Sequence, residues 1–520
     1  MVPHTPSPGV SGEPTSFWRL TGPTLAGGAR LPTRAQTVVA GAGLAGLATA
    51  LELARAGHEV VVIDADQLGG RTTSRTTGKV SLLQGSTVSD LRAHAGDEAV
   101  QTYLTANAAG AAWMRAELAS VPGAWDARPA YTYATTDEGA DALAQEAEAM
   151  AAAGHPVVTH EKPPAHAIGL PMAVGGALRL DAQGQVHPVV AAGVLVDRIR
   201  ELGGVFVDHC RITGAHAAKE GVTISTENGD LVADRLVLAT GTPILDRALL
   251  FATLQPQRQA VVAFRLPSDA VVPAGMYLSV DSGSRSIRTA ADRDGSPVLI
   301  VGGGGITTGR WDAVGDLRDG IVSWAAEHFP GATPITWWAA QDYRMTTRIP
   351  WAGAVRGGRD RIYALTGFAK WGMTNAPAAA IAIAGELAGD APEWHRTLRA
   401  EHAGARDIGE TIKTNAEVGA HLIEGWVVPK SHWPSGRARI VREGLRPVAE
   451  SRLGGVECRV SAVCTHLGGI VRWNDAESSW DCPLHGSRFT PDGRVIEGPA
   501  TTALATIDDG QEAPERAPRG

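Results

Sequence analysis

Residues 37–46 read TVVAGAGLAG, a short apolar run that passes directly into a glycine-rich turn. Apolar residues then recur at helical spacing as far as Ala54, and Gly57 is placed to end that helix. Residues 59–64 form a second apolar run, which ends at Asp64. This order predicts a strand, a tight turn, a helix and a second strand, as in the first unit of an α/β fold.

The glycine spacing G-x-G-x-x-G is typical of a dinucleotide-binding turn. Glycines at these positions let backbone N–H groups at the start of the helix approach a pyrophosphate. We expect this turn to contact the nucleotide through Gly41, Gly43, Leu44, Ala45 and Gly46. Asp64 follows at the distance at which an acidic residue accepts hydrogen bonds from ribose hydroxyls. The alternative is a turn that only packs a helix on a strand.

The chain after Asp64 does not continue as an alternation of strands and helices. It is mostly helical from about 90 to 155 and rich in short β-like runs between about 170 and 350. Three segments resemble the D-amino-acid-oxidase/glycine-oxidase group of FAD enzymes: LVLATG at 236–241, YALTGFAKWGMT at 363–374 and LDAQGQVHP at 180–188. The resemblance implies that the dinucleotide is FAD.

The same resemblance implies further contacts to FAD. Arg71 and Lys79 could neutralise phosphates or could simply be solvated. The full set of implied contacts, beyond the glycine turn and Asp64, is Arg71, Thr77, Lys79, Ile212, Thr240, Gly241, Gly367, Gly372, Met373 and Thr374. The glycine run at 302–305 superficially suggests a second phosphate loop. Its spacing does not fit G-x-G-x-x-G and no apolar helix follows, so we expect a strand and turn of the substrate domain.

Two Cys/His loops lie near the end of the sequence: CTHLGG at 464–469 and CPLHGSRF at 482–489. Two thiolates suit one iron and two imidazoles the other, which is the Rieske 2Fe–2S arrangement. Two cysteines and two histidines would also satisfy zinc. The glycines after each loop and the glycine-rich β segment around them resemble Rieske proteins. We therefore expect the ligands to be Cys464, His466, Cys482 and His485.

Departures from respiratory Rieske proteins concern the cluster's surroundings. Those proteins carry a disulfide-linked extra cysteine in each loop, where this chain has Gly469 and Leu484, and a tyrosine where it has Phe489. Ser487, whose hydroxyl would bond a bridging sulfide, is kept. Loss of the tyrosine hydrogen bond would lower the potential by up to ~60–130 mV. We expect a potential well below the top of the Rieske range of about −150 to +300 mV.

As a whole, residues 16–505 resemble bacterial FAD-dependent oxidoreductases with a C-terminal Rieske domain. The resemblance includes SFW at 16–18, RTTGK at 75–79 and QDY at 341–343. It implies an α/β Rossmann-like FAD-binding domain with an inserted α+β substrate domain, followed by a small all-β Rieske domain. The expected order is a flexible leader (1–32), the oxidoreductase domain (33–397, with substrate parts at about 130–175 and 255–350), a helical connector (398–423), the Rieske domain (424–510) and a tail (511–520).

Composition restricts the class of protein. Apolar residues make up 44% of the 520 residues and charged residues 20%, as in a water-soluble globular chain. The formal charge of −8 argues against binding to nucleic acid or anionic lipid. The four cysteines form no disulfide framework, the start lacks a secretory signal and no run approaches the ~20 apolar residues of a membrane helix. We expect a cytoplasmic protein without an integral membrane segment.

The catalytic residues are the least determined part of the site. Thr347 and Arg348 stand where relatives usually carry Asp-Gly, before the flavin-covering segment. Arg348 could bind a substrate carboxylate, and a solvated surface arginine or a phosphate contact is an equal alternative. Tyr343 and Trp371 could face the flavin, as could Arg344, His187 and Lys370, although a packing role is an equal alternative for each.

We expect an oxidoreductase that dehydrogenates a small molecule, such as the C–N bond of an amine or amino-acid-like compound. Electrons would pass singly through the cluster to an acceptor such as a ferredoxin or quinone. One alternative reverses the flow, with a reduced carrier feeding the cluster and the flavin acting in a tailoring reaction. Another is an electron-transfer or redox-sensing protein without a substrate of its own.

Overall fold

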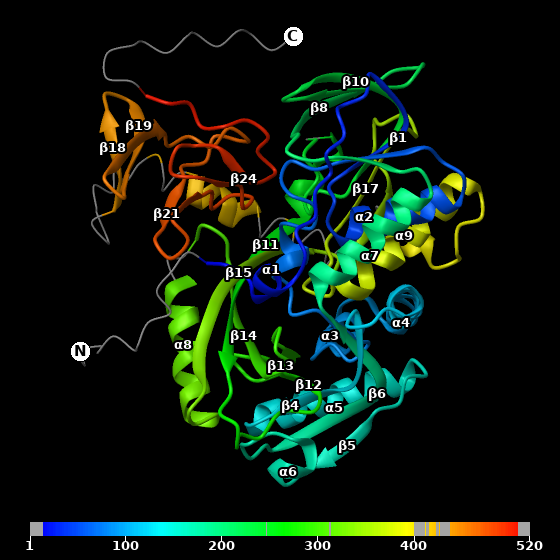
Figure 1. Ribbon diagram of the computed structural model, residues 1–520, viewed down its shortest axis with the longest axis vertical. Coiled ribbons are helices and arrows are strands. Elements are labelled where there is room, and N and C mark those ends of the chain that lie inside the picture. The colour runs from blue at the N-terminus through cyan, green and yellow to red at the C-terminus, as the bar shows by residue number, and fades with distance from the viewer. Residues whose placement is uncertain are drawn as a thin grey trace. The chain divides into compact units, whose positions relative to one another are not determined.

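The computed structural model describes residues 14–245, 247–310, 314–399, 411, 415–422, 426 and 437–507 (Figure 1). The chain forms two compact units. One comprises Met1–Ile306 and Ala313–Lys413, and the other comprises Thr307–Asp312 and Thr414–Gly520.

The first unit contains an eight-stranded sheet whose centre is parallel, in the order β17-β10-β1-β2-β7. Its edges are antiparallel: β16 pairs with β17, and β9 pairs with both β10 and β8. The strands are β1 (Arg34–Ala40), β2 (Val60–Ile63), β7 (Val205–Val207), β8 (Ile212–Ala217), β9 (Val222–Thr226), β10 (Gly229–Leu238), β16 (Trp351–Ala354) and β17 (Ile362–Thr366).

Three helices pack together on this sheet: α2 (Leu44–Arg55), α7 (Pro188–Glu201) and α9 (Gly372–Ala388), which lie side by side in Figure 1. Leu47, Leu195 and Ile383 share one core with Val39 and Val62 of the sheet. The strands β1 and β2 are apolar and buried because both faces of a parallel sheet are covered. Helix α4 (Asp97–Leu118) also packs against α9.

The second sheet of this unit has nine strands, in the order β15-β11-β14-β13-β12-β4-β6-β3, with β5 beside β6. Its strands are β3 (Lys79–Val80), β4 (Trp125–Ala134), β5 (Val158–Glu161), β6 (Gly176–Val186), β11 (Leu254–Arg265), β12 (Met276–Ser279), β13 (Arg285–Ala291), β14 (Pro297–Thr307) and β15 (Thr333–Met345). The glycine run at 302–305 lies within β14, as a strand rather than a phosphate loop.

Short and peripheral elements complete the first unit. They are the helices α3 (Thr87–Ala95), α5 (Asp137–Ala152), α6 (Ala165–Ile168), α8 (Val314–His328) and α10 (His395–Arg399), with the 3-10 turns η1 (Thr72–Arg75) and η2 (Arg247–Thr253). Helix α8 contacts β11 and β15, and α5 contacts β4 and β6.

The expectation of a flexible leader over residues 1–32 does not hold for residues 17–21, which form helix α1 (Phe17–Thr21). The hydroxyl of Ser16 accepts a hydrogen bond from the N–H of Arg19 and caps this helix. Phe17 and Trp18 are buried against β11, β14 and β15, in a core with Val261, Ile300 and Trp338. The apolar residues of this segment therefore anchor it to the second sheet.

In the second unit, residues 415–422 are helical, and the described residues from 437 onward form strands and turns without a helix. One antiparallel sheet contains β18 (Ala438–Glu443), β19 (Arg446–Leu453) and β20 (Val456–Ser461). The other contains β21 (Arg472–Asn474), β22 (Ser479–Asp481), β23 (Arg488–Phe489) and β24 (Val495–Glu497). Most of the expected connector at 398–423 and the tail at 511–520 lie outside the described residues. The predicted fold class, an α/β domain with an α+β insertion and a small β domain, is confirmed.

Candidate functional site

The glycine turn after β1 is closely packed on the sheet. Gly41 adopts φ +102° and donates its N–H to the carbonyl of Ile63 at 2.7 Å. A Cβ atom at this position would lie 2.6 Å from the carbonyl oxygen of Ala239. A side chain at Gly46 would meet the carbonyl oxygen of Gly41, so both positions require glycine.

The start of α2 is where a pyrophosphate would bind. Gly43 is the N-cap residue, and Leu44 and Ala45 open the helix, so their N–H groups have no partner within the helix. The hydroxyl of Thr73 accepts a hydrogen bond from the N–H of Leu44 at 2.8 Å. Thr73 was not among the predicted contacts, and the polar run after the second strand was its only signal in the sequence.

Asp64 lies at the end of β2 and is tied to the same turn. Its carboxylate accepts hydrogen bonds from the N–H of Ala42 at 2.6 Å and of Asp66 at 2.8 Å. Burial raises the pKa of Asp64, and these hydrogen bonds partly oppose that rise. Arg71 forms an ion pair with Asp66 at 2.9 Å, so its charge is shared with a neighbour on the protein.

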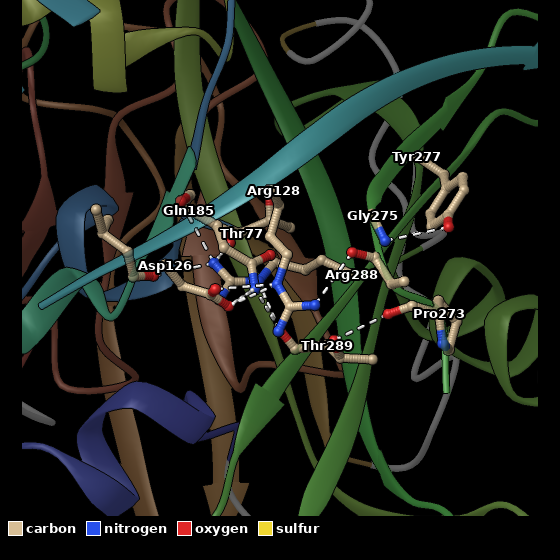
Figure 2. Close-up of polar contacts among 12 residues, drawn as sticks. Thr77, Asp126, Arg128, Gln185, Pro273, Gly275, Tyr277, Arg288 and Thr289 are labelled. Carbon is tan, nitrogen blue, oxygen red and sulfur yellow. Dashed lines mark hydrogen bonds and ion pairs between the residues drawn. The ribbon is translucent and has the colours of Figure 1, made fainter. Parts of the chain in front are cut away.

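The segment that follows η1 is held by side chains from distant parts of the chain. The indole N–H groups of Trp338 and Trp18 donate to the carbonyls of Arg75 and Thr76 at 2.8 and 2.7 Å. Arg288 donates to the carbonyl of Thr77 at 2.7 Å (Figure 2). These contacts join the segment that begins at the pyrophosphate site to the second sheet, and they were not predicted.

Arg288 is buried, with 3% of its surface exposed. Its guanidinium lies 4.9 Å from the ring centroid of Trp18 and also donates to the carbonyl of Val186. Burial lowers its pKa to about 9, with Asp126 as the opposing charge, so it remains a cation at neutral pH. Asp126 itself is bonded to Arg128 and Gln185 (Figure 2).

Lys79, one of the predicted FAD contacts, points into the second sheet. Its ammonium donates to the carbonyl of Tyr277 at 2.6 Å and to the hydroxyl of Ser286 at 2.7 Å. Burial lowers its pKa well below the ordinary value for lysine, and the nearby charge of Arg288 acts in the same direction.

The strand-end segments from the predicted flavin site meet at Gly241. The hydroxyl of Thr366 donates to its carbonyl at 2.5 Å, and a Cβ atom on Gly241 would lie 3.5 Å from the ring of Tyr343. The hydroxyl of Tyr343 accepts a hydrogen bond from Gln341 at 2.7 Å. Tyr343, predicted as catalytic, therefore lies beside a residue predicted to contact FAD. Thr240 directly precedes Gly241, just after the end of β10. Ile212 is buried in one hydrophobic core with Val38 and Ile63.

Lys370 and the glycine run of β14 lie together. The ammonium of Lys370 is 3.2 Å from the position of a Cβ atom on Gly305, and the side-chain amide nitrogen of Gln259 is 3.9 Å from the same position. Asp342 accepts hydrogen bonds from the backbone N–H groups of Tyr343 and Lys370. Burial raises the pKa of Asp342 to about 6. Gln259 was missed because a glutamine within a strand carries no local signal.

Two other predicted candidates have structural contacts. Arg348 adopts φ +61° and donates to the carbonyl of Asp90 in α3 at 3.2 Å, so it is directed toward that helix. His187 is the N-cap residue of α7 and accepts a hydrogen bond from the N–H of Val190. Burial lowers the pKa of His187 to about 4, which keeps the ring neutral in its capping role.

The start of α9 is fixed by a buried polar network. Trp371 is the N-cap residue, and Gly372 and Met373 open the helix. Asn107 accepts hydrogen bonds from the hydroxyl of Thr374 at 2.5 Å and from Gln84 at 3.1 Å, and donates to Asn375 at 2.9 Å. Gly367, just before this segment, adopts φ +79°, and a Cβ atom there would lie 2.4 Å from Met345. The predicted flavin-covering segment is therefore held in place from α4 and β15.

The predicted metal ligands form two pairs in the second unit. The thiols of Cys464 and Cys482 are buried, and the neighbouring Cys482 thiol lowers the pKa of Cys464. The rings of His466 and His485 lie with their centroids 5.1 Å apart. No single point among the described residues gathers three His, Cys, Asp or Glu side chains as a mononuclear metal site would. Two thiols and two imidazoles in separate pairs fit the donor set of a 2Fe–2S cluster.

Each of the two loops supplies one cysteine and one histidine, and a backbone hydrogen bond closes each loop. Cys464 donates its N–H to the carbonyl of Gly469 at 2.8 Å, and Cys482 donates to the carbonyl of Ser487 at 2.8 Å. A Cβ atom on Gly469 would lie 2.6 Å from Leu484, so the two positions that carry cysteines in respiratory Rieske proteins are adjacent here too. Phe489, which replaces their tyrosine, is fully buried.

Among the described residues, no helix has the length and apolar character needed to cross a membrane.

The chain matches two family models. The FAD dependent oxidoreductase model matches residues 36–385, and the Rieske [2Fe-2S] domain model matches residues 447–508. The YhfW protein of Bacillus subtilis (strain 168), named for a Rieske 2Fe-2S iron-sulfur centre, is 29% identical over 490 residues, with 92% of this chain and 94% of that protein covered. The cytochrome b6-f complex iron-sulfur subunit of Triticum aestivum is 39% identical over 99 residues, which are 17% of this chain and 43% of that protein.

Solved structures share the fold of the first unit. L-proline dehydrogenase from P. horikoshii superposes with a TM-score of 0.58 at 16% identity, covering 71% of this chain and 97% of that one. Glycine oxidase from Geobacillus kaustophilus superposes with a TM-score of 0.57 at 19% identity, covering 72% and 100%. At this identity the likeness concerns the fold. The predicted resemblance to amino-acid-oxidase-type FAD enzymes with a Rieske domain is confirmed, and so are the cofactors it implies.

Proposed function

Since the chain belongs to the FAD dependent oxidoreductase family and carries a Rieske domain, we propose that it dehydrogenates a small molecule and delivers the electrons one at a time. The substrate that we propose contains an oxidisable C–N bond, as in an amine or an amino-acid-like compound. The electron acceptor would be an external one-electron carrier such as a ferredoxin or a quinone.

FAD, when bound, accepts a hydride equivalent and can release electrons singly, whereas a 2Fe–2S cluster carries one electron. The glycine turn and the N–H groups at the start of α2 would hold the pyrophosphate, with Thr73 and Asp64 fixing the turn around it. Cys464, His466, Cys482 and His485 would hold the cluster. With both sites in one chain, the protein would take two electrons from a substrate and release them one at a time.

The observation that favours an enzyme over a simple electron relay is the second sheet. Its nine strands bring Tyr343 against Gly241 and Lys370 against Gly305, next to the segments predicted to contact FAD. Glycine inside a strand commonly leaves room for a ligand or another backbone. A relay without a substrate would not need this polar, glycine-lined part of a large second sheet.

Within this site we propose that Tyr343 and Trp371 form walls near the flavin. We keep Arg348 as a candidate for binding a substrate carboxylate, although its contact with the carbonyl of Asp90 requires that it turn away from α3 to do so. Lys370 is the alternative cation for that role, because it already lies among the strand residues Gln259 and Gly305. Replacement of Lys370 or Arg348 by methionine separates the two: the residue that binds the carboxylate raises the KM of anionic substrates far more than that of neutral amines.

The test is anaerobic spectroscopy of the full chain with a panel of amines and amino acids and, separately, NAD(P)H. The proposal predicts that an amine or amino acid bleaches the flavin and that the signal of a reduced Rieske cluster follows. A Cys464→Ser variant, which cannot hold the cluster, should still show flavin bleaching but no such signal. If no compound reduces the flavin while a reduced ferredoxin reduces the cluster, the proposed direction is wrong and electrons enter through the cluster.

A further inference from the structure

Buried charged side chains lie at the base of the hairpin that carries two of the predicted cluster ligands. Strands β22 and β23 flank the loop of residues 482–487, and Asp481 and Arg488 are paired residues at its base. Arg488 donates through Nε to the carboxylate of Asp481 at 2.9 Å. The pair therefore closes the loop that supplies Cys482 and His485.

Two further carboxylates surround the same guanidinium. Glu477 and Glu497 both lie 3.3 Å from Arg488, whose side chain is only 2% exposed. The side chains of Asp481, Glu477 and Glu497 are 4%, 5% and 10% exposed. Three buried carboxylates therefore lie within 3.3 Å of this one buried cation.

Two neutral side chains also form hydrogen bonds with these charged groups. Asn474 donates to Glu477 at 3.1 Å and to Asp481 at 3.0 Å. The hydroxyl of Ser479 donates to Asp481 at 2.8 Å and accepts a hydrogen bond from Arg488 at 2.9 Å. We call these residues the Arg488 network: Asn474, Glu477, Ser479, Asp481, Arg488 and Glu497.

A buried network of this kind acts on a neighbouring metal centre in two ways. Its connected hydrogen bonds hold the ligand loop in one conformation, as the outer contacts of metal ligands generally do. Each of its buried carboxylates opposes the arrival of an electron, and burial prevents solvent from screening that effect. Net charge near the cluster is one of the factors that set the reduction potential of iron–sulfur proteins.

We propose that the Arg488 network positions the second ligand loop and lowers the reduction potential of the cluster, so that the oxidised form is favoured. These are positioning and electrostatic residues, not ligands. The role is independent of the substrate and of the direction of electron flow, so it can fail while the proposed function stands, and the reverse also holds.

The test is an EPR-monitored redox titration of the full chain with its cluster. Glu477→Gln and Glu497→Gln each remove one negative charge with little change of shape. We expect each to shift the one-electron equilibrium at least threefold toward the reduced cluster, about 28 mV at ~59 mV per factor of ten. Arg488→Lys keeps the charge but loses the planar fork, so we expect altered g values or faster loss of iron instead.

Asp492→Asn is the matched control. It removes the same charge from the same domain, but Asp492 is half exposed and paired with the exposed Arg494 at 2.9 Å. We expect its potential and iron content to match the wild type because solvent screens this pair. Loss of iron from a network variant but not from Asp492→Asn supports the positioning role. Unchanged potential with full iron in both glutamine variants, or an equal shift in Asp492→Asn, overturns the proposal.

Discussion

A Cβ atom on Gly46 would lie 1.8 Å from the carbonyl oxygen of Gly41. The obstructing atom belongs to the backbone of the turn that the pyrophosphate would approach, so a side chain can be accommodated only if the turn moves. We predict that Gly46→Ala loses most of its bound FAD, measured as flavin released per chain after purification. Gly214→Ala is the control, because a Cβ atom there would meet nothing within 4 Å. Full flavin content in Gly46→Ala would exclude this turn as the nucleotide site.

Glu146 gives the first unit a distinct dependence on pH. It is fully buried in α5 and accepts hydrogen bonds from the N–H groups of Val88 and Ser89 at the start of α3. Burial raises its pKa from 4.5 to about 7. Because the folded-state pKa lies above the unfolded value, the native state binds this proton more tightly. Stability from this group is complete below about pH 4.5 and is lost as the pH rises through 7.

We therefore predict that Glu146→Gln gains stability relative to the wild type as the pH rises. At ~1.4 kcal/mol per pKa unit, the difference between the two proteins should change by up to ~3 kcal/mol between pH 4.5 and 8. Urea unfolding of both proteins at several pH values measures it. A constant difference over this range would mean that Glu146 is not buried as an acid.

The amide network at α9 should be costly to disrupt. Asn107 is fully buried, and its replacement by leucine leaves Gln84, Thr374 and Asn375 each short of a partner. A buried polar group left unsatisfied costs about 1–3 kcal/mol. We predict a clearly lowered melting temperature for Asn107→Leu, while replacement of the exposed Asn228 by alanine should have little effect. Equal melting temperatures would show that the network contributes nothing to stability.

Phe489 offers a direct test of the missing hydrogen bond near the cluster. It is fully buried in one core with Cys464, Cys482 and Leu484. We predict that Phe489→Tyr raises the reduction potential of the cluster by up to ~60–130 mV, because a hydroxyl can donate to a ligand sulfur. Phe489→Leu, which adds no hydroxyl, should not raise it. A potential unchanged by the tyrosine would mean that its hydroxyl does not reach a ligand.

Short-range signals predicted most of the architecture. The glycine turn, the acidic residue at the end of β2 and the two Cys/His loops each lie within a few residues of sequence. Their chemistry depends on local backbone geometry, which the residue types themselves encode. For the same reason the sequence could distinguish the strand at 302–305 from a phosphate loop.

Contacts that depend on tertiary packing could not be predicted. Trp18 donates to the segment after η1 from α1, Trp338 from β15 and Arg288 from β13, all of them far away in the sequence. Nothing local marks a tryptophan that will donate to a distant carbonyl, so residues 17–21 were expected to be a loose leader. Arg348 is directed toward α3 from a backbone with φ +61°, and an arginine in the sequence does not predict that conformation.

The proposed function depends on the passage of electrons between the flavin and the cluster within one chain. The most direct measurement mixes the full chain anaerobically with less than one equivalent of an amine or amino acid that bleaches the flavin, then freezes samples at intervals for EPR. We predict that the signal of the reduced cluster grows as the reduced flavin is consumed. Flavin that stays reduced at every interval while the cluster stays oxidised and EPR-silent would contradict it.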